Sequence, residues 1–334
     1  MSSINHVHGS NLVSWAKNHS EALVFSADLT ASTEVLAFKE AYPDRFYSFG
    51  LTEQNMMSWA GGMAREGFTP FVHTFAVFMY RRALDQIAIS IAYPNLKVRM
   101  FGFLPGITTP GGVTHQAIDD ISVLRGLPNL TILETGDATD VEAVLNAAQS
   151  VDGPVYIRML RGEMPRLFPK GEPMVVNQAR VLSEGEDLTL ISSGLCTEQA
   201  IAAAKVMRAQ GTTVEHLHIT TLKPFNDPRV VDALRKTKCG VVTVENHTVI
   251  GGLGTAVAEL MASHGMSKRL LRIGVEDTFL HGASRPYLMH EYGLDAETIL
   301  SRCAELVGKR FDGKRELTAD AAEKERRGSD TEAL

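Results

Sequence analysis

The sequence predicts an α/β protein made of two doubly wound, mostly parallel-sheet domains. The chain has 334 residues, which is long for one such domain and comfortable for two. Short apolar runs alternate with longer amphipathic stretches, as expected when helices connect the parallel strands of a sheet. A stretch punctuated by prolines divides this alternation into two rounds, so we expect two domains joined by a linker.

The first round contains five short apolar runs that we expect to be buried strands, separated by stretches with helical periodicity. The expected strands lie at 22–27, 70–75, 97–103, 130–135 and 154–160, and the expected helices lie at about 53–66, 76–91, 117–126 and 138–150. Asp137 and Thr139 precede or open the last of these helices and are candidate caps.

The second round repeats the pattern. We expect strands at 187–194, 213–219, 240–246 and 269–275, and helices at 197–211, 228–236, from 253, and at about 295–307. The expected domains are therefore 1–165 and 181–310, joined by a linker at 166–180. The polar, charged composition from 311 to 334 predicts a mobile tail.

The composition narrows the function classes. A net charge of −6 provides no basic surface for nucleic acid. The three cysteines are Cys196, Cys239 and Cys303; they form no CxxC pair, which disfavours a zinc site or a disulfide framework. The N-terminus lacks the pattern of a signal peptide, and no apolar run approaches the ~20 residues that span a bilayer. We expect a soluble, cytoplasmic protein.

Five segments carry the functional information, and they occur in this order: SADLTAS (26–32), AYPDRFYSFGLTEQNM (41–56), TFAVFMYRRALDQI (74–87), THQAIDDISVLRGLPNLTIL (114–133) and VTVENHTVIGGLGTAVAE (242–259). Together they resemble the pyrimidine-binding and C-terminal domains of the transketolases over about residues 20 to 305. Transketolases use thiamine diphosphate to move two-carbon ketol units between sugars, so the resemblance implies this cofactor and this activity.

The resemblance assigns Glu53 as the carboxylate that activates the cofactor. Such a carboxylate is hydrogen-bonded to the far nitrogen of the aminopyrimidine ring and stabilises the tautomer that acts as an internal base. Gly50 permits a tight connection into a helix whose first turn contains Glu53. An acidic residue in a first turn also complements the helix dipole, which is the structural alternative.

Three further residues are implied as cofactor contacts. Phe78, with Phe75 beside it, is expected to stack on the pyrimidine ring, because a flat heteroaromatic ring is stabilised against aromatic faces in a desolvated slot. Both phenylalanines could instead be core residues. Asp28 is implied to lie near the positively charged ring of the cofactor, although an ordinary turn or capping role suits it nearly as well.

The substrate side is implied to contain His115, Arg161 and Ser32. His115 follows a glycine-rich loop beyond a strand, where ligands of parallel sheets bind, and would polarise or deprotonate a sugar hydroxyl. Arg161 would bind a phosphate or another oxyanion through its guanidinium fork, with Arg158 as the neighbouring competitor. Ser32 would contact the anionic end of the substrate.

The glycine cluster GGLGT at 251–255 lacks the Lys-Ser/Thr of a P-loop and the spacing of a dinucleotide motif, so we assign it no ligand.

The sequence lacks the GDG motif with which this family holds the diphosphate and a divalent cation. We therefore expect a split enzyme, in which a larger partner chain holds Mg²⁺ or another divalent cation, and this chain supplies no metal ligands. Pairs of such subunits are expected to form a heterotetramer. The chain alone is expected to be inactive.

Two departures from the family pattern concern the substrate. Gly111 stands where sugar-phosphate transketolases have an aspartate in the loop before the histidine, and the region of His6 and His8 replaces a substrate-binding arginine. These changes suggest a specialised ketol transferase for an unusual branched or sulfonated sugar.

Three alternatives remain open on sequence alone. The chain could be the β subunit of a 2-oxoacid dehydrogenase or an enzyme similar to deoxyxylulose-phosphate synthase. It could also be a non-catalytic subunit, although the presence of Glu53, the two phenylalanines and His115 disfavours this.

Overall fold

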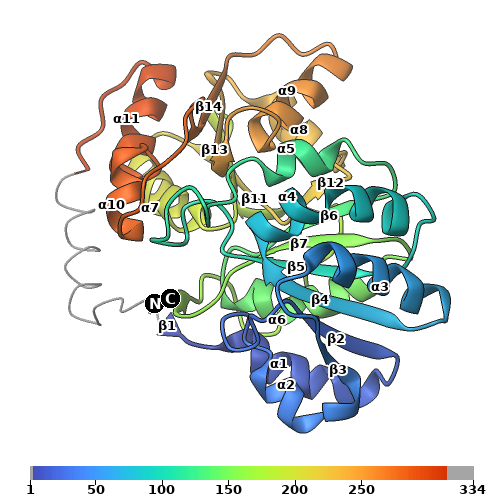
Figure 1. Cartoon of the computed structure of the whole chain (residues 1–334). Coiled ribbons are helices and arrows are strands. Elements are labelled where there is room, and N and C mark those ends of the chain that lie inside the picture. Colours follow the sequence, from blue (N-terminus) through green and yellow to red (C-terminus); the bar gives the residue numbers. More distant parts are fainter. Residues whose placement is uncertain (1–2, 314–334) are drawn as a thin grey trace.

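Two mostly parallel sheets, each covered by helices on both faces, organise residues 3–313, the part of the chain that the computed structural model describes (Figure 1). This architecture confirms the predicted fold class. The expected mobile tail at 311–334 lies outside the described residues from 314 onward.

The first sheet has seven strands in the order β12-β6-β7-β5-β4-β2-β3, parallel except for β12, which runs antiparallel to β6. Its strands are β2 (Ala22–Ser26), β3 (Phe46–Ser48), β4 (Thr69–Phe75), β5 (Arg99–Phe103), β6 (Thr131–Glu134), β7 (Val155–Met159) and β12 (Thr221–Lys223). The central strands are buried along their whole length, which explains why they read as continuous apolar runs.

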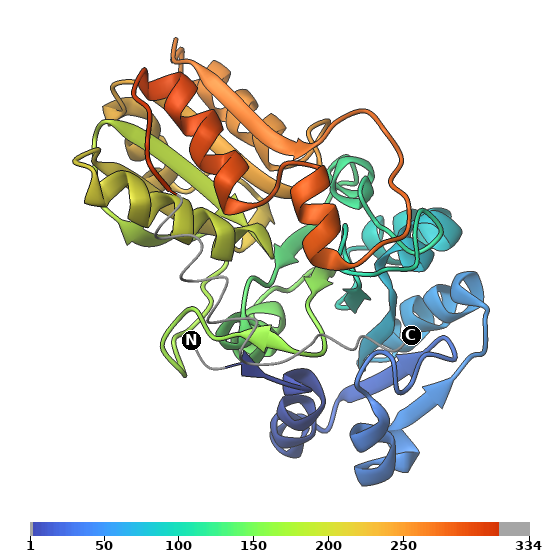
Figure 2. The same ribbon diagram turned by 90° about the vertical axis from the view of Figure 1, so that its left-hand side faces the viewer.

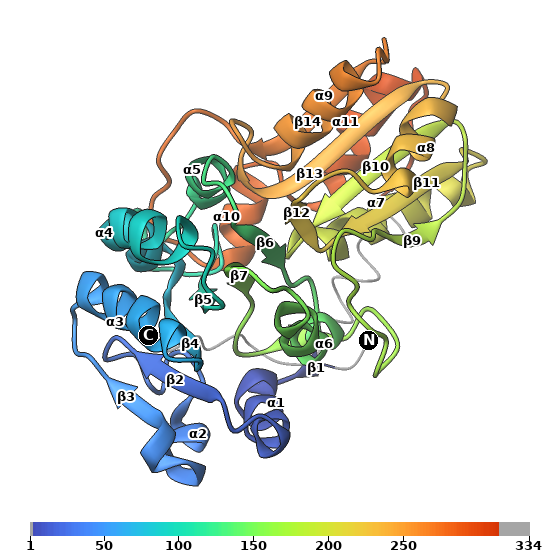
Figure 3. The same ribbon diagram turned by 90° about the vertical axis from the view of Figure 1, so that its right-hand side faces the viewer.

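Helices cover both faces of this sheet. Its helices are α1 (Val7–Trp15), α2 (Leu36–Ala41), α3 (Glu53–Arg65), α4 (Ala76–Gln86), α5 (Asp120–Arg125) and α6 (Ala138–Gln149). Figure 3 shows α1 and α6 together on one side of the sheet and α3 with α4 on the other.

The second sheet has five strands in the order β14-β13-β10-β11-β9, of which β9 is antiparallel to its neighbour. Its elements are β9 (Arg180–Ser183), β10 (Leu188–Ser193), α7 (Cys196–Ala209), β11 (Val214–Ile219), α8 (Pro228–Lys236), β13 (Gly240–Thr248), α9 (Leu253–Ser263), β14 (Leu270–Val275), α10 (Arg285–Glu291) and α11 (Ala296–Val307). Helices α7 and α11 pack together on one face, and α9 packs with α8 on the other. In Figure 2, α11 crosses its face of the sheet while α10 lies toward the first sheet.

Several elements differ from the sequence prediction at their ends. The expected helix at 117–126 begins only at Asp120, and the one expected at 76–91 continues beyond α4 as a π-helical segment, Ile87–Ala92. Asp137 caps α6 by accepting a hydrogen bond from the backbone N–H of Asp140 at 2.8 Å. Thr139 lies inside that helix and donates to the carbonyl of Phe168, so it is not a cap.

The two halves of the chain are joined by more than a linker. The stretch expected as the linker contains the buried Phe168, and β8 (Met164–Pro165) pairs with β1 (Ser3–Ile4) just before it. Strand β12 comes from the second half of the sequence but adds to the edge of the first sheet. Asp140 of α6 accepts a 2.8 Å hydrogen bond from His218 of β11, and both side chains are fully buried. The relative placement of the sheets is therefore set by buried polar contacts.

Within residues 3–313, no helix is long and apolar enough to cross a bilayer.

Four buried histidines predict a marked acid sensitivity. Burial lowers the pKa of His73 and of His216 to about 3, that of His247 to about 4, and that of His8 well below its ordinary value. These rings stay neutral in the folded chain but take up protons near pH 6.5 once unfolded. Stability is therefore fully present above pH ~6.5 and is lost as the pH falls toward 4, by up to about 1.4 kcal/mol per pH unit for each histidine.

This expectation is checked by urea unfolding between pH 7.5 and 5.5, a window above the titration of ordinary carboxylates. We expect the free energy of unfolding to fall as the pH drops below about 6.5, and the fall to be smaller for His216→Asn. A flat profile in this window would contradict the neutral state of the buried rings.

Candidate active site

The candidate residues converge at the carboxyl ends of the parallel strands of the first sheet, where ligands of such sheets bind. They come from the ends of β2, β3, β4, β5 and β7 or from the connections that follow these strands. They are Asp28 and Ser32 after β2, Glu53 at the start of α3, Phe75 at the end of β4, Phe78 in α4, His115 after β5 and Arg161 after β7.

Glu53 is the first residue of α3 and only 2% exposed. Gly50 adopts a left-handed backbone (φ 65°) in the tight connection from β3 into this helix. The carboxylate faces α4, where its Oε1 accepts a hydrogen bond from a guanidinium nitrogen of Arg82 at 2.8 Å. Glu53 is thus a buried carboxylate with a half-exposed cation as its partner.

Two aromatic rings lie beside this pair. The centroids of Phe75 and Phe78 are 5.7 Å apart, and the guanidinium carbon of Arg82 lies 4.0 Å from the centre of the Phe78 ring. A planar, nitrogen-bearing cation therefore covers one aromatic face while it donates to the Glu53 carboxylate. Arg82 follows Phe78 by four positions on α4, which places the two side chains on the same helix face.

Arg82 was not singled out by the sequence analysis. The (i, i+4) spacing within TFAVFMYRRALDQI carried a signal for its contact with Phe78. Its ion pair with Glu53 spans 29 positions and could not be inferred from spacing.

The His115 ring contacts both phenylalanines edge-on. Its centroid lies 5.3 Å from that of Phe78 and 6.1 Å from that of Phe75. Its Nδ1 lies 2.9 Å from the Thr114 hydroxyl. A Cβ added at Gly111 would lie 3.0 Å from both Cβ and Cγ of His115, so this glycine leaves the space that the imidazole occupies.

The loop that carries His115 is held from the second half of the chain. Asn246, in β13, accepts a hydrogen bond from the backbone N–H of Ile107 at 2.9 Å and donates to the carbonyl of Pro105 at 3.0 Å. Gln116 donates to the carbonyl of His281 at 3.2 Å. The position of His115 therefore depends on contacts between the two sheets.

Arg161 lies with its guanidinium carbon 5.9 Å from the centre of the Phe75 ring and donates to the backbone carbonyl of Ser32 at 3.2 Å. The structure thus joins Ser32 to the group through its main chain. Asp28 is exposed with a left-handed backbone (φ 60°), and no contact among the described residues joins its side chain to this group.

Arg158, the alternative to Arg161, lies elsewhere. It is fully buried, its Nε donates to Asp120 at 2.9 Å, and it pairs with Glu134. It also donates to the backbone carbonyl of Asn246 at 2.9 Å. With two carboxylates and a carbonyl as partners it is a structural residue, and Arg161 is the arginine that lies beside the other candidate residues.

The two N-terminal histidines differ in their surroundings. His8 is fully buried, with its Nε2 3.0 Å from that of His73. His6 is exposed and lies 3.5 Å from the carboxylate of Glu34. His8 is therefore a buried residue of the first domain, and the replacement of an arginine by the N-terminal region stays a prediction.

The glycine cluster at 251–255 is occupied by a side chain of the protein itself. Glu245 accepts hydrogen bonds from the backbone N–H groups of Leu253 and Gly254 at the start of α9, at 2.6 and 2.9 Å. Burial raises the pKa of Glu245 to about 8. This carboxyl fills the place where a phosphate would bind, in agreement with the assignment of no ligand.

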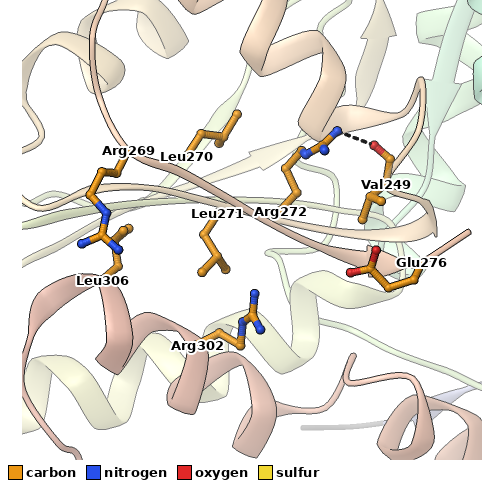
Figure 4. Close-up of a pocket in the computed structure, with 8 residues that line it drawn as sticks. All are labelled: Val249, Arg269, Leu270, Leu271, Arg272, Glu276, Arg302 and Leu306. Carbon is orange, nitrogen blue, oxygen red and sulfur yellow. Dashed lines mark hydrogen bonds between the residues drawn. The ribbon is translucent and has the colours of Figure 1, made fainter.

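The hollow that the structure shows most clearly lies apart from the candidate residues. A hollow of about 310 Å³ lies against β14 and α11 and is lined by Arg269, Arg272, Arg302 and Glu276 among others (Figure 4). It contains none of the candidate residues. Within residues 3–313 no group of three or more His, Cys, Asp or Glu side chains could hold a metal ion.

Comparison with known proteins links this arrangement to one family. The family model described as "Transketolase, pyrimidine binding domain" matches residues 3–166, and "Transketolase, C-terminal domain" matches residues 177–299. A transketolase family protein of Sinorhizobium fredii is 41% identical over 299 residues, which cover 89% of this chain and 87% of that protein.

Three further relatives refine the picture. The 6-deoxy-6-sulfo-D-fructose transketolase subunit of a Clostridium species is 36% identical, over 90% of this chain and 92% of that protein. A solved structure described as a split gene transketolase in an inactive β4 tetramer has a TM-score of 0.82 and 35% identity, over 91% of this chain and 97% of that one. The 1-deoxy-D-xylulose-5-phosphate synthase of Geobacter sulfurreducens is 30% identical, and the chain spans only 46% of its length.

The two neighbouring arginines should respond differently to substitution. Arg158→Met leaves Asp120 and Glu134 buried without their cation, so we expect the free energy of unfolding to fall by about 3–5 kcal/mol. Arg161→Met removes a partly exposed contact and should change it by less than about 1 kcal/mol. Chemical unfolding of both variants checks this. A similar loss for the two would contradict the assignment of Arg158 as the structural residue.

Proposed function

Because the chain belongs to the transketolase family, through its pyrimidine-binding and C-terminal domains, we propose that it is one subunit of a two-chain, thiamine-diphosphate-dependent transketolase. The proposed reaction transfers a two-carbon ketol unit from a ketose to an aldose. One observation carries the proposal: a flat, nitrogen-bearing group already fits between Glu53 and the Phe78 ring.

The contacts of Arg82 test whether the residues fit the cofactor. Its guanidinium is planar, stacks on Phe78 and donates a hydrogen bond to Glu53. An aminopyrimidine ring is also planar and carries nitrogen atoms at its edge, so the same carboxylate and the same aromatic face suit it. The residues present therefore fit the cofactor's ring, provided that Arg82 moves aside.

In this proposal each side chain has a defined task. When bound, thiamine diphosphate supplies the nucleophilic carbon that cleaves the bond beside the ketose carbonyl. Glu53 holds a proton between its carboxylate and the edge of the pyrimidine, and its burial keeps competing water away. Phe78 and Phe75 orient the ring by stacking, and Asp28 faces the positively charged part of the cofactor.

His115, Arg161 and Ser32 form the proposed substrate side. The imidazole of His115 lies against the aromatic pair and accepts or donates the proton of a substrate hydroxyl. Arg161 binds the anionic end of the sugar through its guanidinium. Ser32 supports it with the carbonyl that already accepts from Arg161.

The substrate proposed is a sugar with an anionic end whose recognition does not need an aspartate before His115. A Cβ at Gly111 would lie 3.0 Å from Cβ and Cγ of His115, so an aspartate there would require the His115 side chain to shift by a few tenths of an ångström. The relative named as a 6-deoxy-6-sulfo-D-fructose transketolase subunit supports a sulfonate as the anionic group.

We propose that a partner chain supplies the diphosphate and Mg²⁺ half of the site. The chain spans 92% of a relative named as a subunit and 97% of a chain described as split gene transketolase, whose tetramer is described as inactive. Leu51 precedes and Trp59 follows Glu53 in the sequence, and their exposures of 67% and 54% leave apolar surface that a partner chain could cover.

The catalytic role of Glu53 predicts a large effect of its amide. In the assembled complex, Glu53→Gln should lower kcat by at least about 100-fold, because an amide cannot exchange a proton with the ring. Glu66→Gln, at the exposed end of the same helix, is the matched control and should leave kcat unchanged. Turnover by Glu53→Gln equal to that of the control would rule out the catalytic role.

The divided site predicts that the chain alone binds the cofactor poorly. Calorimetric titration of the isolated chain with thiamine diphosphate and Mg²⁺ should show no saturable binding, whereas the complex with its partner should bind. Strong binding of thiamine diphosphate by the isolated chain, or ketol transfer by it, would contradict the two-chain proposal.

A further inference from the structure

We propose that Glu34 is a positioning residue that fixes the direction of Arg161 among the proposed substrate-binding residues. It belongs to the turn after β2 and is buried, with its side chain only 3% exposed. The inference rests on the proposed function in one respect, the assignment of Arg161 to the anionic end of the substrate.

The carboxylate of Glu34 joins three segments of the chain. One oxygen, Oε1, accepts a hydrogen bond from the backbone N–H of Gly162 at 2.8 Å, and the other, Oε2, accepts from the backbone N–H of His8 at 3.2 Å. Hydrogen bonds to an ionised acceptor are about twice as strong as neutral ones. Through these hydrogen bonds, Glu34 connects its own turn to the start of α1 and to the loop after β7.

The backbone of this turn is unusual for a glutamate. Glu34 has a left-handed conformation (φ 57°), which non-glycine residues rarely adopt and which the surroundings must stabilise. Backbone hydrogen bonds from Thr33 to Leu29 and from Val35 to Thr30 close the turn. The observed conformation turns the carboxylate toward Gly162 instead of leaving it in solvent.

Helix α1 is shaped to pack on Glu34. A Cβ added at Gly9 would lie 2.6 Å from the carbonyl oxygen of Glu34, so only a glycine allows this approach. The helix therefore packs directly on this turn.

Arg161 is consequently attached to the same turn at two points. Gly162, the next residue, is bonded to the Glu34 carboxylate and has a left-handed backbone (φ 67°). The guanidinium of Arg161 donates to the carbonyl of Ser32, two residues before Glu34. One contact fixes the main chain and the other fixes the side chain, so Glu34 sets the direction in which Arg161 points without touching a substrate.

A purely structural Glu34 would behave differently. Loss of a structural tie would lower stability and reduce every kinetic parameter of the enzyme together. Loss of a positioning residue would act through Arg161, raising KM for the anionic sugar while cofactor binding and kcat stay close to normal.

The test uses the assembled enzyme with Glu34→Ala, Glu34→Gln and the exposed control Glu40→Ala. Glu34→Ala should raise KM for the ketose by about 10- to 100-fold, change kcat by less than about threefold, and leave the dissociation constant of thiamine diphosphate unchanged. Glu34→Gln keeps one acceptor oxygen and should recover much of the loss. The control should match the unmodified enzyme.

Two further measurements separate the inference from the proposed function. Hydrogen exchange of the Gly162 amide should accelerate in Glu34→Ala, and the KM effect should vanish in an Arg161→Met background. Unchanged exchange, or equal losses of kcat and cofactor binding, overturns the inference. If Arg161→Met leaves KM unchanged, the proposed substrate role of Arg161 is wrong, and the exchange of Gly162 alone then decides whether Glu34 holds this loop.

Discussion

The buried guanidinium of Arg158 is the contact on which the arrangement of the molecule depends. It pairs with Asp120 at the start of α5 and with Glu134 in β6, and it donates to the main chain of Asn246 in β13. Burying three charges costs solvation, and only good geometry with further hydrogen bonds offsets that cost. These contacts bring α5, the first sheet and the second sheet together at Arg158.

This constraint reaches the candidate site through the loop of His115. Asp120 begins the helix directly after that loop, and Asn246 holds its other end through Pro105 and Ile107. The contact between the His115 imidazole and Phe78 therefore depends on the contacts between the two sheets. The carboxylate of Glu53 comes from α3 and reaches the same group of residues through Arg82 of α4, which stacks on Phe78.

Much of the fold follows from the sequence because buried parallel strands read as short apolar runs, as at 22–27 and 154–160. The edge strand β12 was missed because its three residues join a sheet built mostly from the other half of the chain. The resemblance to transketolases named Glu53, Phe78, His115 and Arg161, and the structure places all four near the Phe75 and Phe78 rings, whereas their roles stay predictions. Burial, which separates Arg158 from Arg161 and hides His8, depends on tertiary packing and leaves no local pattern. The ion pair of Arg82 with Glu53 likewise could not be predicted from the sequence, because its two residues come from different helices.

The central claim is that Glu53 and Phe78 receive the aminopyrimidine ring in the place that the Arg82 guanidinium takes in the free chain. The most direct measurement is a structure of the complex with its partner chain and thiamine diphosphate. We expect the Glu53 carboxylate within hydrogen-bond distance of a ring nitrogen, the ring on the face of Phe78, and Arg82 moved away from both. A cofactor bound elsewhere, with Glu53 still paired to Arg82, would contradict the account.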